Sequence, residues 1–233
     1  MSVWFVTPAW QRYAVSALCF EQRRWVIDRL AESGIEANCV VVADDENLDL
    51  ARSFGFVTVE RDNEWLGRRF NDGIEYAARQ GAEWIVPIGS DSWIAPAYLD
   101  PLPDPELTRT ATRYALASRI ALAELLVGGN GVGPYMIHRK RLPRSKRPAD
   151  DHLSRGIDGS TLAGLKGLEW EVRDVHPLQY VALRSNDPQL NPYKHLVRRF
   201  GVREHRGGRW ERLAKVYPPD LVERTRLLLT SRR

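Results

Sequence analysis

The sequence predicts an α/β fold in which a mostly parallel sheet is flanked by helices. In the first hundred residues, short apolar runs alternate with longer segments whose apolar residues recur at helical spacing. Gly34, Gly55 and Gly81 follow those longer segments, as is typical of helix C-termini. Strands that alternate with helices pair in parallel through right-handed crossovers, which place helices on both faces of the sheet.

Four strands and three helices are expected in this first half. The carboxyl ends of parallel strands meet at one edge of the sheet, here called the carboxyl edge, where ligands of such folds bind. Three of the four strand ends carry acids, at 44–45, 61–63 and 90–92, so we expect a polar, acidic edge. The expected strands are VWFVT (3–7), NCVVVA (38–43), FVTVE (56–60) and EWIVPIG (83–89), and the expected helices are 10–33, 46–55 and 66–81.

Beyond residue 100 the alternation is less regular. The GGNGVG stretch is expected to be a turn, because a dinucleotide fingerprint needs a strand before it and a helix after it. In order, we expect a proline-rich connection (101–107), a strand crossing to a helix around 117–127, the GGNGVG turn (128–133) and a strand over PYMIHRKRL (134–142). A polar, basic and mobile stretch (144–155), a helix capped by Asp158 or Ser160, a strand within 175–185 and a basic helical tail follow.

The composition excludes several classes of protein. With 233 residues, of which 43% are hydrophobic and 27% charged, the chain has globular rather than disordered composition. No apolar run reaches the length of a membrane span, and the N-terminus lacks the features of a signal peptide. Cys19 and Cys39 are too few for a disulfide framework or a cysteine-based zinc site, so we expect a cytoplasmic protein with reduced thiols.

Positive charge is concentrated in two stretches. Residues 198–233 hold 11 Lys and Arg against 4 Asp and Glu, and HRKRLPRSKR (138–147) holds no acid. Such clusters suit phosphate-rich partners, namely nucleic acid, anionic lipid or a nucleotide diphosphate. A solvated surface explains them equally well.

Asp91, alone between two serines after the fourth strand, is the most informative acidic strand end. It can be a turn residue, a cap or a ligand of a divalent cation, which prefers oxygen ligands and can bridge a diphosphate. Asp44 and Asp45 can bind a nucleoside or simply form a turn. Asn71, unfavourable inside a helix, points to the carboxyl edge or is exposed. The absence of HExxH, Gly-x-Ser-x-Gly and Cys-x-x-Cys argues against hydrolases and zinc fingers.

Four motifs in order resemble those of nucleotide-sugar glycosyltransferases of the GT-A fold, in particular family 2. They are TPAWQR (7–12), VADDENLD (42–49), NEWLGRRFNDGIEYA (63–77) and GSDSWIAPAYL (89–99). The strand before RKRL, the IDGS stretch and ALRSNDPQLNPY resemble the acceptor half of small phage-encoded glycosyltransferases. The resemblance implies a GT-A domain over 1–197, with a nucleotide-sugar-binding half (1–100) and an acceptor-side half (101–197), and a basic helical extension over 198–233.

The resemblance also implies roles for individual residues. Asp91 would bind the metal at the D-x-D position, whose first acid is Gly89 here, with His176 or His152 as a further ligand. Asp158, with Asp151 and Asp150 as alternatives, would be the base that deprotonates the acceptor, although Asp158 can equally be only a helix cap. The expected nucleotide-binding residues are Thr7, Pro8, Arg12, Asp44, Asp45, Arg68, Asn71, Ser90 and Arg184. Arg184, Lys194 and 139–147 could also neutralise the departing diphosphate.

These features predict transfer of a hexose or pentose from a nucleotide donor, expected to be UDP-linked, to an acceptor hydroxyl with the help of Mn²⁺ or Mg²⁺. A hydroxylated base in DNA or a protein is the expected acceptor, since basic clusters can contact phosphates. Two alternatives stay open. One is a non-catalytic nucleic-acid-binding module on a degenerate transferase scaffold, which Gly89 favours. The other is a nucleotidyltransferase, which would need a basic glycine-rich loop that TPAWQR does not supply.

Overall fold

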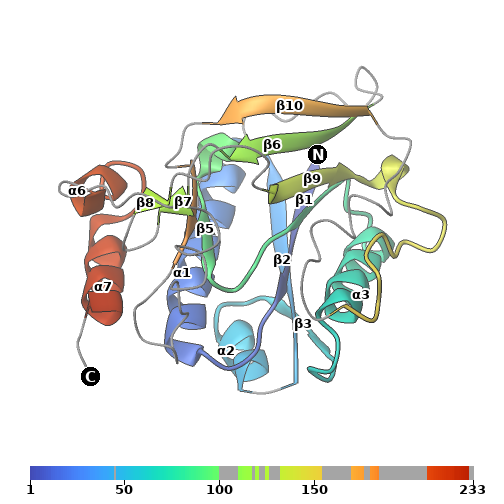
Figure 1. Cartoon of the computed structure of the whole chain (residues 1–233), viewed down its shortest axis with the longest axis horizontal. Coiled ribbons are helices and arrows are strands. Elements are labelled where there is room, and N and C mark those ends of the chain that lie inside the picture. The colour runs from blue at the N-terminus through green and yellow to red at the C-terminus, as the bar shows by residue number, and fades with distance from the viewer. Residues whose placement is uncertain are drawn as a thin grey trace.

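A seven-stranded sheet forms the centre of the molecule (Figure 1). The computed structural model describes residues 1–44, 46–99, 110–116, 119–120, 124–125, 132–153, 169–175, 179–183 and 209–230. The sheet runs in the order β10-β6-β9-β4-β1-β2-β3. Its strands are β1 (Ser2–Pro8), β2 (Glu36–Ala43), β3 (Val57–Glu60), β4 (Trp84–Pro87), β6 (Thr110–Leu116), β9 (Val132–His138) and β10 (Glu169–Val175).

The pairing of the strands is mostly parallel, which confirms the predicted fold class. β1 pairs in parallel with β2 and β4, and β2 pairs in parallel with β3. β9 is antiparallel to β4 and β6, and β10 is parallel to β6. The carboxyl ends of β1 to β4 therefore lie along one edge, as expected from the sequence.

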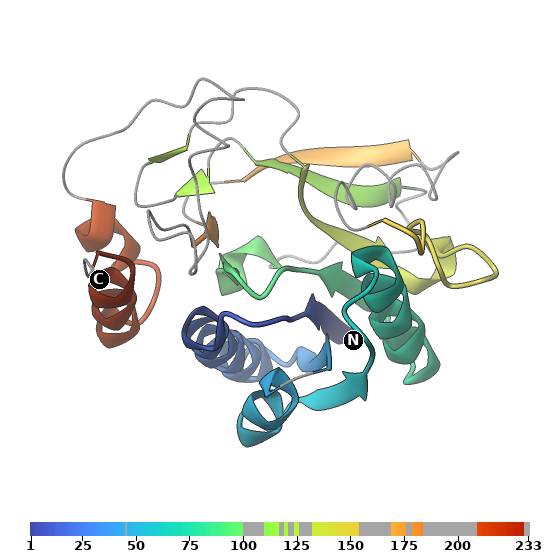
Figure 2. The ribbon, with the colours of Figure 1, turned by 60° about the horizontal axis from the view of Figure 1, so that its bottom comes forward.

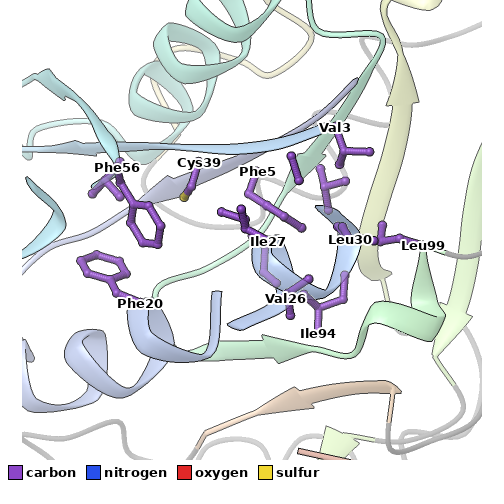
Figure 3. Close-up of a cluster of buried hydrophobic side chains, with 14 of the residues drawn as sticks. Val3, Phe5, Phe20, Val26, Ile27, Leu30, Cys39, Phe56, Ile94 and Leu99 are labelled. Carbon is purple, nitrogen blue, oxygen red and sulfur yellow. The ribbon is translucent and has the colours of Figure 1, made fainter. Parts of the chain in front are cut away.

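Helices cover both faces of the sheet. α1 (Tyr13–Glu32) and α2 (Asn47–Ser53) lie on one face, and α3 (Leu66–Arg79) lies on the other (Figure 2). Strand side chains alternate between the faces, so Val3 and Phe5 face α1 whereas Trp4 and Val6 face α3. Figure 3 shows the α1 side of this core, where Phe20, Val26, Ile27 and Leu30 pack against Val3, Phe5 and Cys39.

Gly73 allows α3 to approach the sheet closely. A Cβ atom at this position would clash with Cγ1 of Val6 on β1 and would lie 3.1 Å from Cγ2 of Val42 on β2. A larger residue would therefore push the helix outward. This close packing fixes the N-terminal half of α3, which carries the predicted site residues Arg68 and Asn71.

A second, smaller core lies on the outer side of α1. β5 (Ser92–Ile94) pairs antiparallel with β11 (Tyr180–Ala182), and η1 (Pro96–Tyr98) follows β5. α6 (Arg209–Leu213) and α7 (Pro219–Thr230) pack beside α1, where Arg224 of α7 forms an ion pair with Glu21 (Figure 1). The described part of the predicted basic extension is therefore helical, and its apolar side chains belong to a core shared with α1. The residues of this core include Val15, Leu18, Trp93, Val181, Leu213, Tyr217, Leu221 and Val222.

Several expectations for the second half need correction. The helix expected around 117–127 is wrong, because the described residues there form two short antiparallel strands, β7 (Arg119–Ile120) and β8 (Glu124–Leu125). Pairing between strands overrides the helix propensity of this Ala- and Leu-rich stretch. The expected late strand is β11, and η2 (Arg139–Arg141) follows β9. The helix expected over 157–167 and most of the GGNGVG turn lie outside the described residues.

No helix in the described ranges is both long and apolar enough to cross a membrane.

Candidate active site

The ends of four neighbouring strands approach one another at the carboxyl edge. The Asp44 Oδ2 atom, just after β2, accepts a hydrogen bond of 2.9 Å from the backbone N–H of Asn63, which follows β3. Arg12, in the loop after β1, points Nη1 at Oδ2 of Asp91, which follows β4, at 3.5 Å. Two polar links therefore join the four strand ends that the sequence singled out.

The loop between β1 and α1 has an unusual backbone. Gln11 and Arg12 both adopt φ values of 50°, in the left-handed region that residues other than glycine rarely occupy. Such a conformation costs on the order of 1–2 kcal/mol per residue, and it tends to occur at functional sites. The Arg12 carbonyl accepts the first hydrogen bonds of α1, from Val15 and Ser16, both 2.9 Å long. The strained turn therefore starts the helix and directs Arg12 towards Asp91.

Two buried polar side chains hold this loop in place. Arg69 of α3 donates a hydrogen bond of 2.9 Å from Nη1 to the Ala9 carbonyl. Asn47, at the start of α2, donates from Nδ2 to the Gln11 carbonyl at 3.2 Å. Because both helices that follow β2 and β3 contact the loop, its position depends on the packing of the whole sheet half.

The Asp91 carboxylate is held on two sides and is 16% exposed. Its Oδ1 atom accepts a hydrogen bond of 3.1 Å from the hydroxyl of Ser92, and its Oδ2 atom faces Arg12. The buried Tyr180 of β11 donates in turn to the Ser92 hydroxyl at 3.0 Å. The Asp91 carbonyl accepts from the backbone N–H of Leu183 at 2.7 Å. The strand that positions Asp91 is thus fixed by residues far away in the sequence.

Gly89 makes this conformation of Asp91 possible. A Cβ atom at position 89 would lie 2.7 Å from Oδ1 of Asp91, which is closer than real Cβ atoms approach other atoms. The departure from the D-x-D pattern is therefore accompanied by a carboxylate that occupies the space of the missing side chain. An acid at position 89 would require Asp91 to adopt a different rotamer.

α1 supports β5 from below with two buried polar residues. The Gln22 amide donates to the Ile94 carbonyl at 2.6 Å and accepts from the Ile94 N–H at 3.3 Å. Arg23 donates from Nη2 to the Ser92 carbonyl at 3.2 Å, and its guanidinium lies 4.7 Å from the centre of the Phe5 ring. Burial lowers the pKa of Arg23 from its ordinary value. These contacts fix the backbone that follows Asp91.

Residues 143–153, here called the docking segment, bind along α3 rather than forming the mobile stretch expected at 144–155. The buried Asn71 amide donates to the Ala149 carbonyl at 2.7 Å and to Oδ1 of Asp151 at 2.8 Å, and it accepts from the Ala149 N–H at 3.0 Å. At the N-terminus of α3, the N–H of Gly67 donates to the Leu153 carbonyl at 2.9 Å. The docking segment therefore leads the chain to the carboxyl edge.

Arg147 anchors the docking segment electrostatically. Its guanidinium bonds to Asp151 at 2.7 Å, to Asp72 at 2.8 Å and to Glu75 at 3.1 Å. Asp72 also pairs with Arg61. Hydrogen bonds from these carboxylates raise the pKa of Arg147. This cation of the 138–147 cluster is thus neutralised within the protein.

Asp151 has a structural set of partners in this network. Partial burial raises its pKa, but hydrogen bonds from Arg147 and Asn71 outweigh burial and hold it below its ordinary value. A carboxylate with a lowered pKa is a weak base. The catalytic role expected of Asp151 and the nucleotide contact expected of Asn71 stay predictions, since both side chains bind other protein groups here.

The remaining predicted residues fall into two groups. Thr7, Pro8 and Ser90 are buried beneath the carboxyl edge, and Arg68 is half-buried at the N-terminal end of α3. His152, the alternative metal ligand, stacks edge-on against Trp65 with ring centres 5.8 Å apart. Four predicted site residues lie outside the described residues: Asp45, Asp158, His176 and Arg184.

Sequence reasoning missed three residues of this site. Tyr180 reaches Asp91 through Ser92, and no local signal reveals a contact between positions so far apart. Trp10 is 43% exposed and Tyr13 is 37% exposed, although both are large and apolar. Their signal was available, because both flank the TPAWQR motif at a predicted strand end.

The donor atoms of the described residues fit a cation only when it brings ligands of its own. Within the described ranges, no three or more His, Cys, Asp and Glu side chains form a metal-binding group. Cys19 and Cys39 are buried free thiols whose pKa values are raised by burial, to about 11 for Cys39. Mg²⁺ and similar ions are commonly bound by one or two carboxylates together with substrate phosphates and water. Asp91 can serve as such a carboxylate.

Comparison with known proteins gives no match in sequence but a likeness in structure. No protein-family model matches the chain, and no curated protein matches it. The catalytic domain of Drosophila β1,4-galactosyltransferase 7 in complex with xylobiose has a TM-score of 0.57 at 11% identity, covering 89% of this chain and 82% of that one. A mutant of that enzyme with manganese, UDP-Gal and xylobiose has a TM-score of 0.54 at 9% identity, covering 91% and 79%.

A structure from another class of enzyme is also similar. The 4-diphosphocytidyl-2C-methyl-D-erythritol synthase of Anaerococcus prevotii has a TM-score of 0.51 at 9% identity, covering 75% of this chain and 88% of that one. At such identities the likeness concerns the fold alone. The chain therefore has the GT-A type of fold found in nucleotide-sugar transferases.

Proposed function

We propose that this protein transfers a sugar from a nucleotide-sugar donor to an acceptor hydroxyl. The observation that carries this proposal is the approach of Arg12 to Asp91 at the carboxyl edge, at 3.5 Å. It combines a cation suited to phosphate with a carboxylate suited to a metal ion, beside a strained loop. The fold likeness to a galactosyltransferase supports the same reading.

Asp91 would hold Mn²⁺ or Mg²⁺, a metal ion that stabilises the negative charge of a departing nucleotide diphosphate. Arg12 would contact the diphosphate, because its planar guanidinium can bind two phosphate oxygens at once. Tyr180 and Ser92 would keep the Asp91 carboxylate oriented. Thr7, Pro8 and Ser90 would shape the floor of the site.

The donor is proposed to be UDP-linked. The exposed rings of Trp10 and Tyr13 at the end of β1 offer flat surfaces on which a nucleobase can stack, a contact worth about 1–3 kcal/mol per base. Asp44, Asp45 and Arg68 would contact the nucleoside, and Arg184 the diphosphate. We expect the enzyme to act in the cytoplasm, where the Cys19 and Cys39 thiols stay reduced.

The acceptor is proposed to approach from the side of residues 101–197. Asp158, as the base, would take the proton from the acceptor hydroxyl while the nucleotide diphosphate leaves. The docking segment supports this role, because its end at Leu153 is bound to Gly67 at the carboxyl edge, shortly before Asp158 in the chain. Asp151 is the less suitable base because of its bonds to Arg147 and Asn71.

A hydroxylated base in DNA or a protein is the proposed acceptor, in line with the phage-like resemblance of this half. Arg139, Lys140 and Arg144 are exposed on and beside the docking segment, where they could contact phosphates of DNA. We keep the division into a GT-A domain over 1–197 and an extension over 198–233 as part of the proposal.

A nucleotidyltransferase is the second candidate, favoured by the fold likeness to the Anaerococcus synthase. A non-catalytic nucleic-acid-binding module is the third, favoured by Gly89 at the D-x-D position. The test is incubation with a panel of nucleotide sugars and Mn²⁺ or Mg²⁺, with and without DNA carrying hydroxylated bases. Release of nucleoside diphosphate supports sugar transfer. Pyrophosphate release from a nucleoside triphosphate, or salt-sensitive DNA binding without donor turnover, would overturn it in favour of the second or third candidate.

A further inference from the structure

Both oxygens of the Asp91 carboxylate face protein groups in the structure. Oδ1 accepts from the Ser92 hydroxyl at 3.1 Å, and Oδ2 lies 3.5 Å from Nη1 of Arg12. A metal ion that binds this carboxylate must therefore meet the positive charge of Arg12 at very short range. Two cations at such a distance repel each other strongly unless an anion lies between them.

We propose that Arg12 and a divalent cation compete for Asp91, and that Arg12 moves to the diphosphate when the cation arrives bound to a nucleotide. This inference rests on the proposed function and adds an order of events to it. The free cation binds poorly, because Asp91 is already neutralised. The cation–nucleotide complex binds well, because it brings an anionic group for Arg12 as its cation takes Asp91.

Gly89 is the reason that the competing pair can form. With a side chain at this position, the Asp91 carboxylate could not keep its present place, because a Cβ atom would lie 2.7 Å from Oδ1. The same glycine removes the second carboxylate that a D-x-D motif would offer to a metal ion. One carboxylate with a guanidinium partner attracts a free divalent cation much less than two unpaired carboxylates do.

Arg12 is well placed to exchange partners. Its side chain is 31% exposed, so the guanidinium can rotate without leaving a buried cavity. Its backbone is fixed, because the Ala9 and Gln11 carbonyls are bound by Arg69 and Asn47. Only side-chain torsions need to change, and the movement is limited to the space around Asp91. A guanidinium suits both partners, since it binds carboxylates and phosphates with the same planar donors.

The exchange makes cation and nucleotide binding mutually dependent. Each should strengthen the binding of the other by the same factor, as thermodynamic linkage requires. Removing the charge of Arg12 should weaken this dependence from both sides. The free cation would bind more tightly, because its competitor is gone, and the nucleotide would bind less tightly, because its diphosphate loses a partner.

The test compares Mn²⁺ binding to the full chain without nucleotide, measured from the electron paramagnetic resonance signal of free Mn²⁺. Arg12→Gln is expected to bind Mn²⁺ about three- to tenfold more tightly than the original protein. Arg12→Lys, which keeps the charge, should stay close to the original. Arg24→Gln is the matched control, because Arg24 lies on the same helix but pairs with Asp28 on the surface.

A second titration measures UDP binding at saturating Mn²⁺. Arg12→Gln is expected to lose about tenfold in UDP affinity, while Arg24→Gln is unchanged. Adding Asp91→Asn to Arg12→Gln should abolish the gain in Mn²⁺ affinity, which identifies the binding carboxylate. An Arg12→Gln protein that binds free Mn²⁺ no better than the original overturns the exchange. Turnover of nucleotide sugars by the original protein would still stand in that case, so the two failures are distinguishable.

Discussion

A Cβ atom at Gly89 would lie 2.7 Å from Oδ1 of Asp91. The glycine and the carboxylate therefore form one structural unit, in which the absence of a side chain at one position sets the rotamer at the other. That rotamer points Oδ2 at Arg12 and Oδ1 at the Ser92 hydroxyl.

Substitution of Gly89 should separate the steric part of this unit from its charge. Gly89→Ala displaces the Asp91 carboxylate without adding a ligand, so we expect about a fivefold or greater loss of UDP affinity at saturating Mn²⁺. Gly89→Asp displaces it and adds a carboxylate, so we expect tighter Mn²⁺ binding without nucleotide. Calorimetric titration of both variants checks this. Equal behaviour of the two variants would mean that only bulk matters at position 89.

Tyr180 should act on the site through Ser92 without contacting the donor. Tyr180→Phe removes the donor of the 3.0 Å bond to Ser92 but keeps the ring, so stability should fall by only about 1 kcal/mol. Donor turnover should fall several-fold, because the Ser92 hydroxyl becomes free to reorient. Tyr76→Phe on α3, whose ring packs on Trp4, is the matched control. Unchanged kcat and KM in Tyr180→Phe would remove this residue from the account.

Asn71 should be important for stability because it fixes the docking segment. Asn71→Ala leaves the buried N–H and C=O of Ala149 without their partner, which should cost about 2–4 kcal/mol. Asn38→Ala, on the exposed side of β2, should cost less than about 0.5 kcal/mol. Urea unfolding of both variants measures the difference. Limited proteolysis should cut Asn71→Ala within 143–153, and resistance there would contradict the proposed anchoring.

The Arg147–Asp151 pair should make part of the stability depend on acid pH. The folded-state pKa of Asp151 lies below its ordinary value of 3.8, so its ionised form favours folding. This contribution is fully present above about pH 5 and is lost as the pH falls below the ordinary value. The stability difference between the original protein and Asp151→Asn should therefore shrink between about pH 5 and pH 3. Urea midpoints at several pH values test this, and a difference that grows on acidification would contradict the sign.

The first half of the fold could be predicted almost completely from the sequence. Apolar runs and terminal glycines such as Gly34 and Gly55 mark β1 to β4 and α1 to α3 within a few residues, because the signals are local. β5 was missed because three residues carry no periodic pattern. β10 was missed because EWEVRDV alternates charged and apolar residues, and its pairing with β6 depends on distant sequence.

The site was predictable to the extent that topology determines it. Parallel strands had to bring Arg12 and Asp91 to the same edge, and the structure has them 3.5 Å apart. The partners of Asn71 and Asp91 could not be predicted, because Ala149 and Tyr180 are 78 and 89 positions away from them. Contacts at such separations depend on how the second half folds back on the first.

The central claim is that Asp91 binds the metal-bound diphosphate of a nucleotide sugar. Its most direct test is calorimetric titration of UDP and UDP-sugars in the presence of Mn²⁺ into the original protein and Asp91→Asn. We expect binding to the original protein and a loss of at least about tenfold in affinity for Asp91→Asn, with unchanged thermal unfolding. Equal affinity of both proteins for every donor, or no binding to either, would contradict the claim.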